Sequence, residues 1–323
     1  MNKLIVSVVI LISANCVFAN DVPDDPIACI WKNTAFEDFC DTCGCGGNGG
    51  SMGFGTGLNN NFIGLRYIGQ KYRSRDGIFD NSPWINENFN TVQLWGKIPV
   101  SNRITINTLL PYHRHNRTFA DNTEQKINGI GDATLLAYYN LIQPLPDSII
   151  SIKPKHALQI GGGLKLPTGS FDTANIEGSV NPSFQLGTGS WDYLLAANYG
   201  LTYRNWGFST MVNYTLKTEN SVNYQFGNQL NLTLNAFKTY YASNSLAFTP
   251  QIGIGTEHYE QNKEFGLIVN DTGGDVVFAR LGLEATFKRY ALGLSSMLPM
   301  AQKLNNGKVE VKNRVSFYLN INI

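Results

Sequence analysis

The feature that most constrains this fold is a strict alternation of apolar and polar residues along runs of similar length. In the final run, VSFYLNINI (315–323), Val, Phe, Leu and Ile fall at odd positions and Ser, Tyr and Asn at even positions. Successive side chains of a strand point to opposite faces, so a period of two indicates β-strand. The same alternation recurs at residues 92–98, 158–166, 207–217, 230–236 and 277–287. The chain is therefore predicted to be all-β.

The length and composition of these runs favour strands that cross a membrane. A tilted strand needs about 9–11 residues to cross the hydrocarbon core, whereas strands of soluble proteins are typically about 5–6 residues long. Only 15% of the 323 residues are charged, against about 25% in soluble domains. A soluble β-sandwich is the alternative, but its water-facing side should be richer in charge than the Asn, Thr, Ser, Gln and Gly found here.

These observations predict a transmembrane antiparallel β-barrel of 12 strands, with 14 as the alternative, because single-chain bacterial barrels have an even number of strands. Aromatic residues end several runs, for example Tyr203 and Trp206, and suit the interfacial girdles of such a barrel. Short links are expected at 99–102 and 288–289. Long polar loops are expected at 71–88, 112–128, 168–180 and 258–273.

The N-terminus is typical of a secretory signal peptide. A single Lys3 precedes an apolar stretch at 4–12, and a small-residue cleavage site follows at 17–19. The alternative is lipidation at Cys16, but a lipobox needs a very small residue where Asn15 stands.

The chain therefore divides into a signal peptide (1–19), a Cys/Gly-rich segment predicted to form a plug or periplasmic extension (20–57), and an outer-membrane β-barrel (58–323). We expect it in the outer membrane of a Gram-negative cell, in contact with outer-membrane lipid. The formal net charge of +1 gives no electrostatic case for nucleic acid as a partner.

The N-terminal segment contains four cysteines: Cys29, Cys40, Cys43 and Cys45. An even number of cysteines in an oxidising compartment favours two disulfides, whose pairing the sequence leaves open. The four thiolates could instead hold zinc, or Cu(I), which prefers soft ligands. The second Cys-x2-Cys pair of a typical zinc site is missing. No other cofactor is expected.

His113 and His115, within PYHRHNR, are separated by one residue and would share a face of a strand, where they could hold a metal. Because the run falls at the start of a segment expected to be a loop, the favoured prediction is a solvated, basic stretch at the rim of the barrel. Such a rim could attract anionic solutes or lipopolysaccharide phosphates.

Several charged residues fall on the polar faces of the predicted strands and should line the lumen. They could pair across it and close it, or form a polar path for a solute. Facing lipid, a mid-membrane Arg or Lys would cost about 2–4 kcal/mol. The residues are Arg66, Lys97, Asp132, Lys165, Arg280 and Glu284.

Catalytic motifs are weak, and no enzyme is expected. GGSMG (49–53) matches G-x-S-x-G in letters but follows a cysteine cluster rather than a core strand. The chain has only four histidines, and none lies in a persuasive nucleophile–base setting.

Two stretches carry a family resemblance. GIGDATLLAYYNLI (129–142) and LQIGGGLKLPTGSFD (158–172) resemble the outer-membrane barrels grouped with the meta-pathway phenol-degradation (MetA-like) proteins. In that family a Gly-x-Gly-Asp strand start precedes a glycine-rich strand that ends in Lys-Leu-Pro-Thr-Gly. The cysteine tract is similar to the Cys-Gly-Cys leader of some Bacteroidota barrels. The glycines and Pro167 are expected to shape the barrel rather than bind a ligand.

The resemblance implies a channel for a small, hydrophobic or aromatic solute. Passage would be passive, through the lumen or a lateral opening, and gated by the N-terminal segment. The alternative is a barrel-anchored module that binds metal or exchanges disulfides through its cysteines and meets a periplasmic partner.

Overall fold

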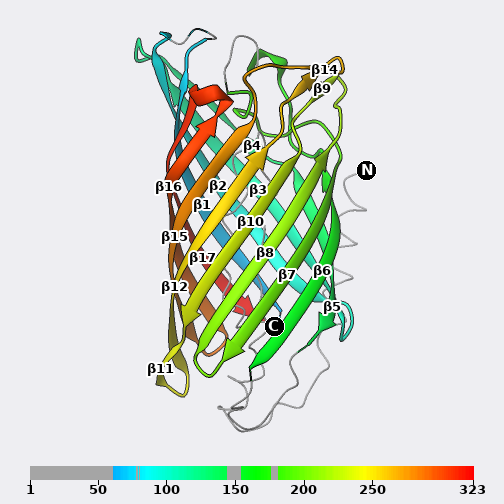
Figure 1. Cartoon of the computed structure of the whole chain (residues 1–323), viewed down its shortest axis with the longest axis vertical. Coiled ribbons are helices and arrows are strands. Elements are labelled where there is room, and N and C mark those ends of the chain that lie inside the picture. The colour runs from blue at the N-terminus through cyan, green and yellow to red at the C-terminus, as the bar shows by residue number, and fades with distance from the viewer. Residues whose placement is uncertain (1–60, 78, 80, 144–153, 176–180) are drawn as a thin grey trace.

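The computed structural model describes residues 61–77, 79, 81–143, 154–175 and 181–323. In this part of the chain, twelve antiparallel strands close into a barrel (Figure 1). In order around the wall they are β1 (Phe62–Arg75), β2 (Trp84–Pro99), β3 (Ile104–Thr118), β5 (Ala133–Ile142), β6 (Lys155–Leu166), β7 (Asp192–Tyr203), β8 (Trp206–Lys217), β10 (Gln229–Lys238), β12 (Leu246–Tyr259), β15 (Gly274–Phe287), β16 (Tyr290–Leu304) and β17 (Val309–Asn322). Because β1 pairs with β17, the ring has no free edge. The predicted fold and the strand number of 12 are confirmed.

Five shorter strands decorate this ring. β4 (Glu124–Ile130) extends the hairpin of β3, and β11 (Tyr240–Ser243) pairs with β12 at the opposite end. β9 (Tyr224–Gln225), β13 (Lys263–Glu264) and β14 (Leu267–Ile268) form a small separate sheet. Two 3₁₀ turns complete the described elements, η1 (Thr173–Asn175) and η2 (Asn305–Gly307). Within the described ranges, no helix has the length and apolarity of a membrane span.

The outer wall is apolar and the inner wall is mainly polar. Along β1 the side chains alternate between buried and exposed, with Leu65 pointing outward and Arg66 inward. The outward side chains include Leu195, Ile252 and Leu294, each more than half exposed. A soluble protein would bury such residues. The exposed apolar face therefore meets lipid, and the protein lies in the outer membrane.

Some of the predicted loops are wrong because the strands are longer than expected. β1 continues to Arg75 and β2 begins at Trp84, so most of 71–88 is strand. β3 likewise continues to Thr118, and β4 fills much of 112–128. Beyond the lipid, the outer face of a strand meets water, so the apolar alternation ends before the strand does. The segment 258–273 is largely a loop, as predicted.

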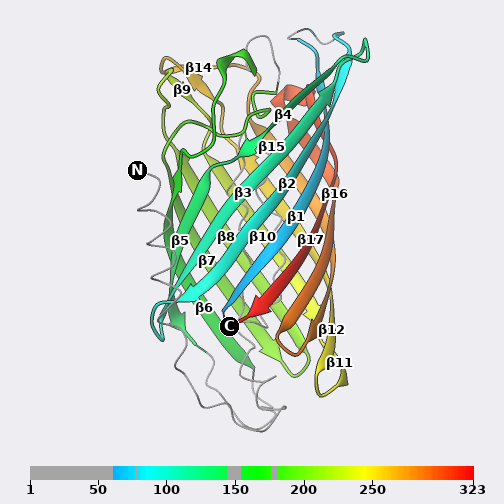
Figure 2. The same ribbon diagram turned by 180° about the vertical axis from the view of Figure 1, so that it is seen from behind.

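The two ends of the barrel differ in their links. One end has two-residue turns at 204–205 and 288–289, and the C-terminus lies there (Figure 2). The other end has the long connections 167–191, 218–228 and 260–273. Outer-membrane barrels have short periplasmic turns and longer extracellular loops. We therefore name these the short-turn (periplasmic) end and the long-loop (extracellular) end.

The predictions for the N-terminus fall outside the described residues. They concern the signal peptide, the segment 20–57, and Cys29, Cys40, Cys43 and Cys45.

Candidate functional site in the barrel lumen

The connection between β6 and β7 folds into the lumen at the long-loop end. In its described part, Phe184, Gln185 and Thr188 have no exposed surface. The Phe184 ring lies 6.0 Å from the ring of Phe89 on β2 and 6.4 Å from that of His115 on β3. Both wall residues point inward. The loop therefore covers the inner wall rather than projecting into solvent.

One carboxylate holds this loop to the wall. Asp132, fully buried at the break between β4 and β5, accepts hydrogen bonds from the backbone N–H groups of Gly169 and Thr188, both at 2.9 Å. Lys165 Nζ lies 3.0 Å from Asp132 Oδ2 and 2.6 Å from Asp192 Oδ2, and it also contacts the Thr188 hydroxyl. We call Asp132, Lys165, Thr188 and Asp192 the loop anchor. Several donors surround each carboxylate, which offsets the cost of burying it.

The loop anchor brings the two distinctive sequence motifs together. Thr168, from the KLPTG motif, donates to the carbonyl of Gly131 at 2.7 Å and accepts from the N–H of Ala133 at 2.8 Å. These bonds close the gap between β4 and β5. β6 ends at Leu166, immediately before Pro167, as the sequence predicts. The motifs thus form one structural unit at the root of the loop.

Glycine is required where the loop meets the anchor. A Cβ on Gly187 would lie 2.6 Å from Asp132 Oδ1 and 2.5 Å from the carbonyl oxygen of Gly169. On β6, a Cβ on Gly161 would lie 2.7 Å from the Tyr138 ring, so this glycine shapes the wall. In contrast, the nearest atom to a Cβ on Gly162 would be 3.8 Å away.

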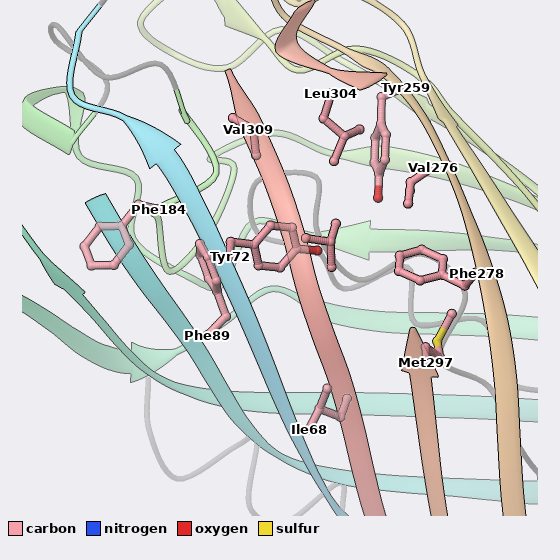
Figure 3. Packing of buried hydrophobic residues seen from close by; sticks show 11 residues of the cluster. Ile68, Tyr72, Phe89, Phe184, Tyr259, Val276, Phe278, Met297, Leu304 and Val309 are labelled. Atoms are coloured by element: carbon pink, nitrogen blue, oxygen red, sulfur yellow. The ribbon is translucent and has the colours of Figure 1, made fainter. Parts of the chain in front are cut away.

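Apolar side chains gather inside the barrel at the same end (Figure 3). Such a cluster is unusual because the interior of an outer-membrane barrel is normally polar. Tyr72 and Phe89 pack edge to face, with ring centroids 5.4 Å apart. The buried members come from six strands of the ring and the inward loop: Ile68, Tyr72, Phe89, Phe184, Tyr259, Val276, Phe278, Met297, Leu304, Val309 and Val311. We call them the lumen apolar cluster.

A buried ion pair spans the wall beside this cluster. Arg314 on β17 makes a two-point contact with Glu257 on β12, at 2.6 Å from Nη1 to Oε1 and 3.0 Å from Nη2 to Oε2. Arg314 Nε also donates to the Tyr72 hydroxyl at 3.0 Å, and the Tyr259 hydroxyl donates to Glu257 at 2.6 Å. We call these four residues the Arg314 cluster. It joins three strands of the ring, β1, β12 and β17.

The histidine pair lies in the lumen, and its prediction as a solvated rim is wrong. His113 and His115 belong to β3, are each 3% exposed, and have ring centroids 4.7 Å apart. His113 Nδ1 lies 2.8 Å from the Thr91 hydroxyl. The error follows from ending the strand too early. Among the described residues, no group of three or more His, Cys, Asp and Glu side chains is arranged to hold a metal.

The six charged residues expected inside are all buried, at 3% exposure or less. Asp132 and Lys165 contact each other. Arg66 donates to Gln93 at 3.0 Å and lies over the Trp95 ring at 4.5 Å. Glu284 accepts a hydrogen bond from the Tyr318 hydroxyl. Lys97 and Arg280 face the lumen elsewhere on the wall.

Sequence reasoning missed Arg314, Glu257 and Glu87. Each lies on the inward register of its strand, outside the apolar runs read from the sequence. Glu87 falls in the predicted loop 71–88, Glu257 is the last residue before the predicted loop 258–273, and Arg314 immediately precedes the run 315–323. Glu87 accepts a hydrogen bond from Asn181 of the inward loop at 2.5 Å. Continuing the alternation past the apolar run would have found all three.

One cavity beside the inward loop is too small for an organic solute. It is lined by loop residues 181–183 and by Phe226, Tyr259, Leu304 and Val309. Its volume of about 40 Å³ has room for a few water molecules but not for an aromatic ring.

The closed twelve-strand ring and its lipid-facing apolar wall define an outer-membrane β-barrel whose lumen is occupied by an extracellular loop. Residues 83–294 match the family model described as "Putative MetA-pathway of phenol degradation". The chain belongs to this family. Among curated proteins, no sequence matches it.

A solved structure of an outer-membrane protein shares the barrel fold. An outer membrane channel from Pseudomonas putida is similar with a TM-score of 0.59 and 17% sequence identity, over 81% of this chain and 95% of that one. The β domain of the Bordetella autotransporter BrkA gives a TM-score of 0.49 at 10% identity, over 82% of this chain and 100% of that one. At these identities the likeness concerns the fold.

Proposed function

We propose that this protein is an outer-membrane channel, rather than an enzyme, through which a small hydrophobic solute diffuses passively. An aromatic compound is the first choice of solute. The β6–β7 loop closes the extracellular end of the lumen and moves aside when a solute passes.

The lumen apolar cluster is the observation that carries this proposal. Phe89, Phe184 and Phe278 are buried inside the barrel, where a pore for polar solutes would expose polar groups to water. Aromatic rings pack favourably against one another in edge-to-face contacts. The inner wall can therefore offer an aromatic solute the contacts that Phe184 now makes.

Two comparisons support the proposal. The description of the family names phenol degradation, and the similar structure from Pseudomonas putida is described as an outer membrane channel.

The test uses intact Gram-negative cells, whose lipopolysaccharide layer excludes hydrophobic compounds. Cells that express the protein should admit the aromatic probe N-phenyl-1-naphthylamine several-fold faster than cells with an empty vector. Entry should rise in proportion to probe concentration and should not change when the proton gradient is collapsed.

The matched control is a polar solute without aromatic rings, arabinose, whose entry is followed by the swelling of proteoliposomes that contain the protein. Its rate should stay at the level of protein-free liposomes. If arabinose enters faster and the aromatic probe does not, the protein is a polar pore, and the proposal is wrong.

A further inference from the structure

At the short-turn end, the links that the structure describes carry cations without acids. In the described links at this end, residues 99–104, 203–206, 238–246 and 287–290, there are five cations and no Asp or Glu. At the long-loop end the signs are mixed, as in the ion pairs Arg73–Glu310 and Lys308–Asp271. We call the five cations and the aromatic residues beside them the basic rim: Arg103, Arg204, Lys238, Lys288 and Arg289, with Tyr139, Tyr203, Trp206, Tyr240, Phe287 and Tyr290.

Each cation of the rim lies against an aromatic side chain. Lys238 Nζ is 4.8 Å from the ring centre of Trp206 and 4.9 Å from that of Tyr240. Arg204 and Arg289 lie over neighbouring tyrosines at 5.4 and 5.6 Å, and Lys288 lies over Phe287 at 5.5 Å.

Arg103 completes the set by donating to the Tyr139 hydroxyl at 3.3 Å. All of these aromatic residues are exposed. On the strands of the ring, they continue the outward register of the wall.

In two turns at this end, a cationic residue occupies a backbone position where glycine or asparagine is usual. In Tyr203–Trp206 and Phe287–Tyr290, the first turn residue has a positive φ, 53° at Arg204 and 51° at Lys288. This left-handed conformation is unfavourable for residues that carry a Cβ, and hairpin turns normally place Gly or Asn there. The pattern aromatic–cation–x–aromatic thus occurs twice on the same rim despite its backbone strain.

We propose that the basic rim binds the anionic headgroups of phospholipids in the inner leaflet of the outer membrane. Aromatic girdles lie at the level of lipid headgroups, so cations packed on these rings reach the phosphates. Lys and Arg beside a membrane surface attract anionic lipid. None of the five cations is ion-paired with an acid among the described residues. A membrane fits better than a soluble acidic protein, because the rings face outward into the bilayer.

The test measures lipid retention by the full chain. Protein in detergent is mixed with equal amounts of phosphatidylglycerol and phosphatidylethanolamine, and the bound lipids are counted by native mass spectrometry. The rim variant carries Arg204→Asn, Lys238→Gln, Lys288→Asn and Arg289→Gln. Asparagine tolerates a positive φ, so the variant should fold. The control variant removes four exposed cations of the long-loop end: Lys126→Gln, Lys263→Gln, Lys303→Gln and Lys312→Gln.

We expect wild-type protein and the control variant to retain phosphatidylglycerol preferentially, with ratios within twofold of each other. Each cation near an anionic surface raises the affinity for anionic lipid about fivefold. The ratio of bound phosphatidylglycerol to bound phosphatidylethanolamine should therefore fall at least about tenfold in the rim variant. An unchanged ratio in the rim variant, or an equal loss in the control, would overturn the proposal. Entry of N-phenyl-1-naphthylamine should be the same in the rim variant and the wild type, which separates this test from that of the channel.

Discussion

The loop anchor and the Arg314 cluster lie at the same end of the barrel, and both bury carboxylates with cations, yet they join different parts of the chain. The loop anchor attaches the β6–β7 loop to the wall through Asp132 and Lys165. The Arg314 cluster attaches wall strands to one another. Buried contacts between carboxylates and cations therefore hold a loop against the wall in one place and hold wall strands together in the other. Variants should separate the two roles.

The largest effect is expected from breaking the Arg314 cluster. Glu257→Gln leaves a buried guanidinium without its charged partner, which should lower the free energy of unfolding by about 3–5 kcal/mol. The shift is measured from the urea midpoint in detergent micelles. The matched control is Glu310→Gln, because the Arg73–Glu310 pair is partly exposed and should contribute less than about 1 kcal/mol. Equal losses in the two variants would remove the distinction between buried and exposed pairs.

Breaking the loop anchor should release the loop and leave the barrel folded. Asp132→Ala removes the acceptor of two backbone N–H groups and of Lys165. Lost bonds of this kind weaken the closed state by about 3 kcal/mol in total, which is more than a hundredfold in the ratio of closed to open loop. Amide hydrogen exchange of residues 181–190 should accelerate accordingly. Comparable acceleration in the wall strands would indicate general unfolding instead.

A smaller effect is expected from crowding the anchor without removing its charge. Gly187→Ala places a Cβ 2.6 Å from Asp132 Oδ1 and should push the loop outward, at a cost of about 1–3 kcal/mol. Gly162→Ala is the control, since its Cβ meets no atom closer than 3.8 Å. Exchange of the loop amides should rise in the first variant and stay at the wild-type rate in the second. Identical behaviour of both would contradict the close packing at Gly187.

The smallest effect is expected from a partly buried ion pair at the same end, Lys308 with Asp271. Lys308 donates a hydrogen bond to Asp271 at 2.7 Å and lowers the pKa of that carboxyl. A depressed folded-state pKa means that the pair stabilises the fold above the unfolded-state pKa, about 3.9 for Asp. The contribution is lost as the pH falls through the lower folded-state value.

The urea midpoints of wild-type protein and Asp271→Asn should therefore differ slightly at pH 6 and converge as the pH falls below the lowered folded-state pKa of Asp271. A gap that persists in acid would mean that the charge of Asp271 is not its cause.

The barrel was predictable from the sequence because lipid on one side and polar groups on the other impose the alternation seen in VSFYLNINI. The same reasoning fails where lipid ends. Arg314, Glu257 and the His113–His115 pair lie on strand extensions whose outer face meets water, so they were missed or taken for loop residues. The inward course of the β6–β7 loop depends on long-range contacts, such as Asn181 with Glu87. No local sequence pattern predicts such contacts. Asp132 and Lys165 were identified as inward residues, but their role as an anchor required the fold.

Single-channel recording in planar bilayers tests the central claim most directly, namely that the anchored β6–β7 loop closes the lumen. Wild-type protein should show rare and brief openings. Asp132→Ala should be open for most of the record, while Glu257→Gln should keep the wild-type open probability as long as it remains folded. If Asp132→Ala is as closed as the wild type, the loop does not gate the barrel.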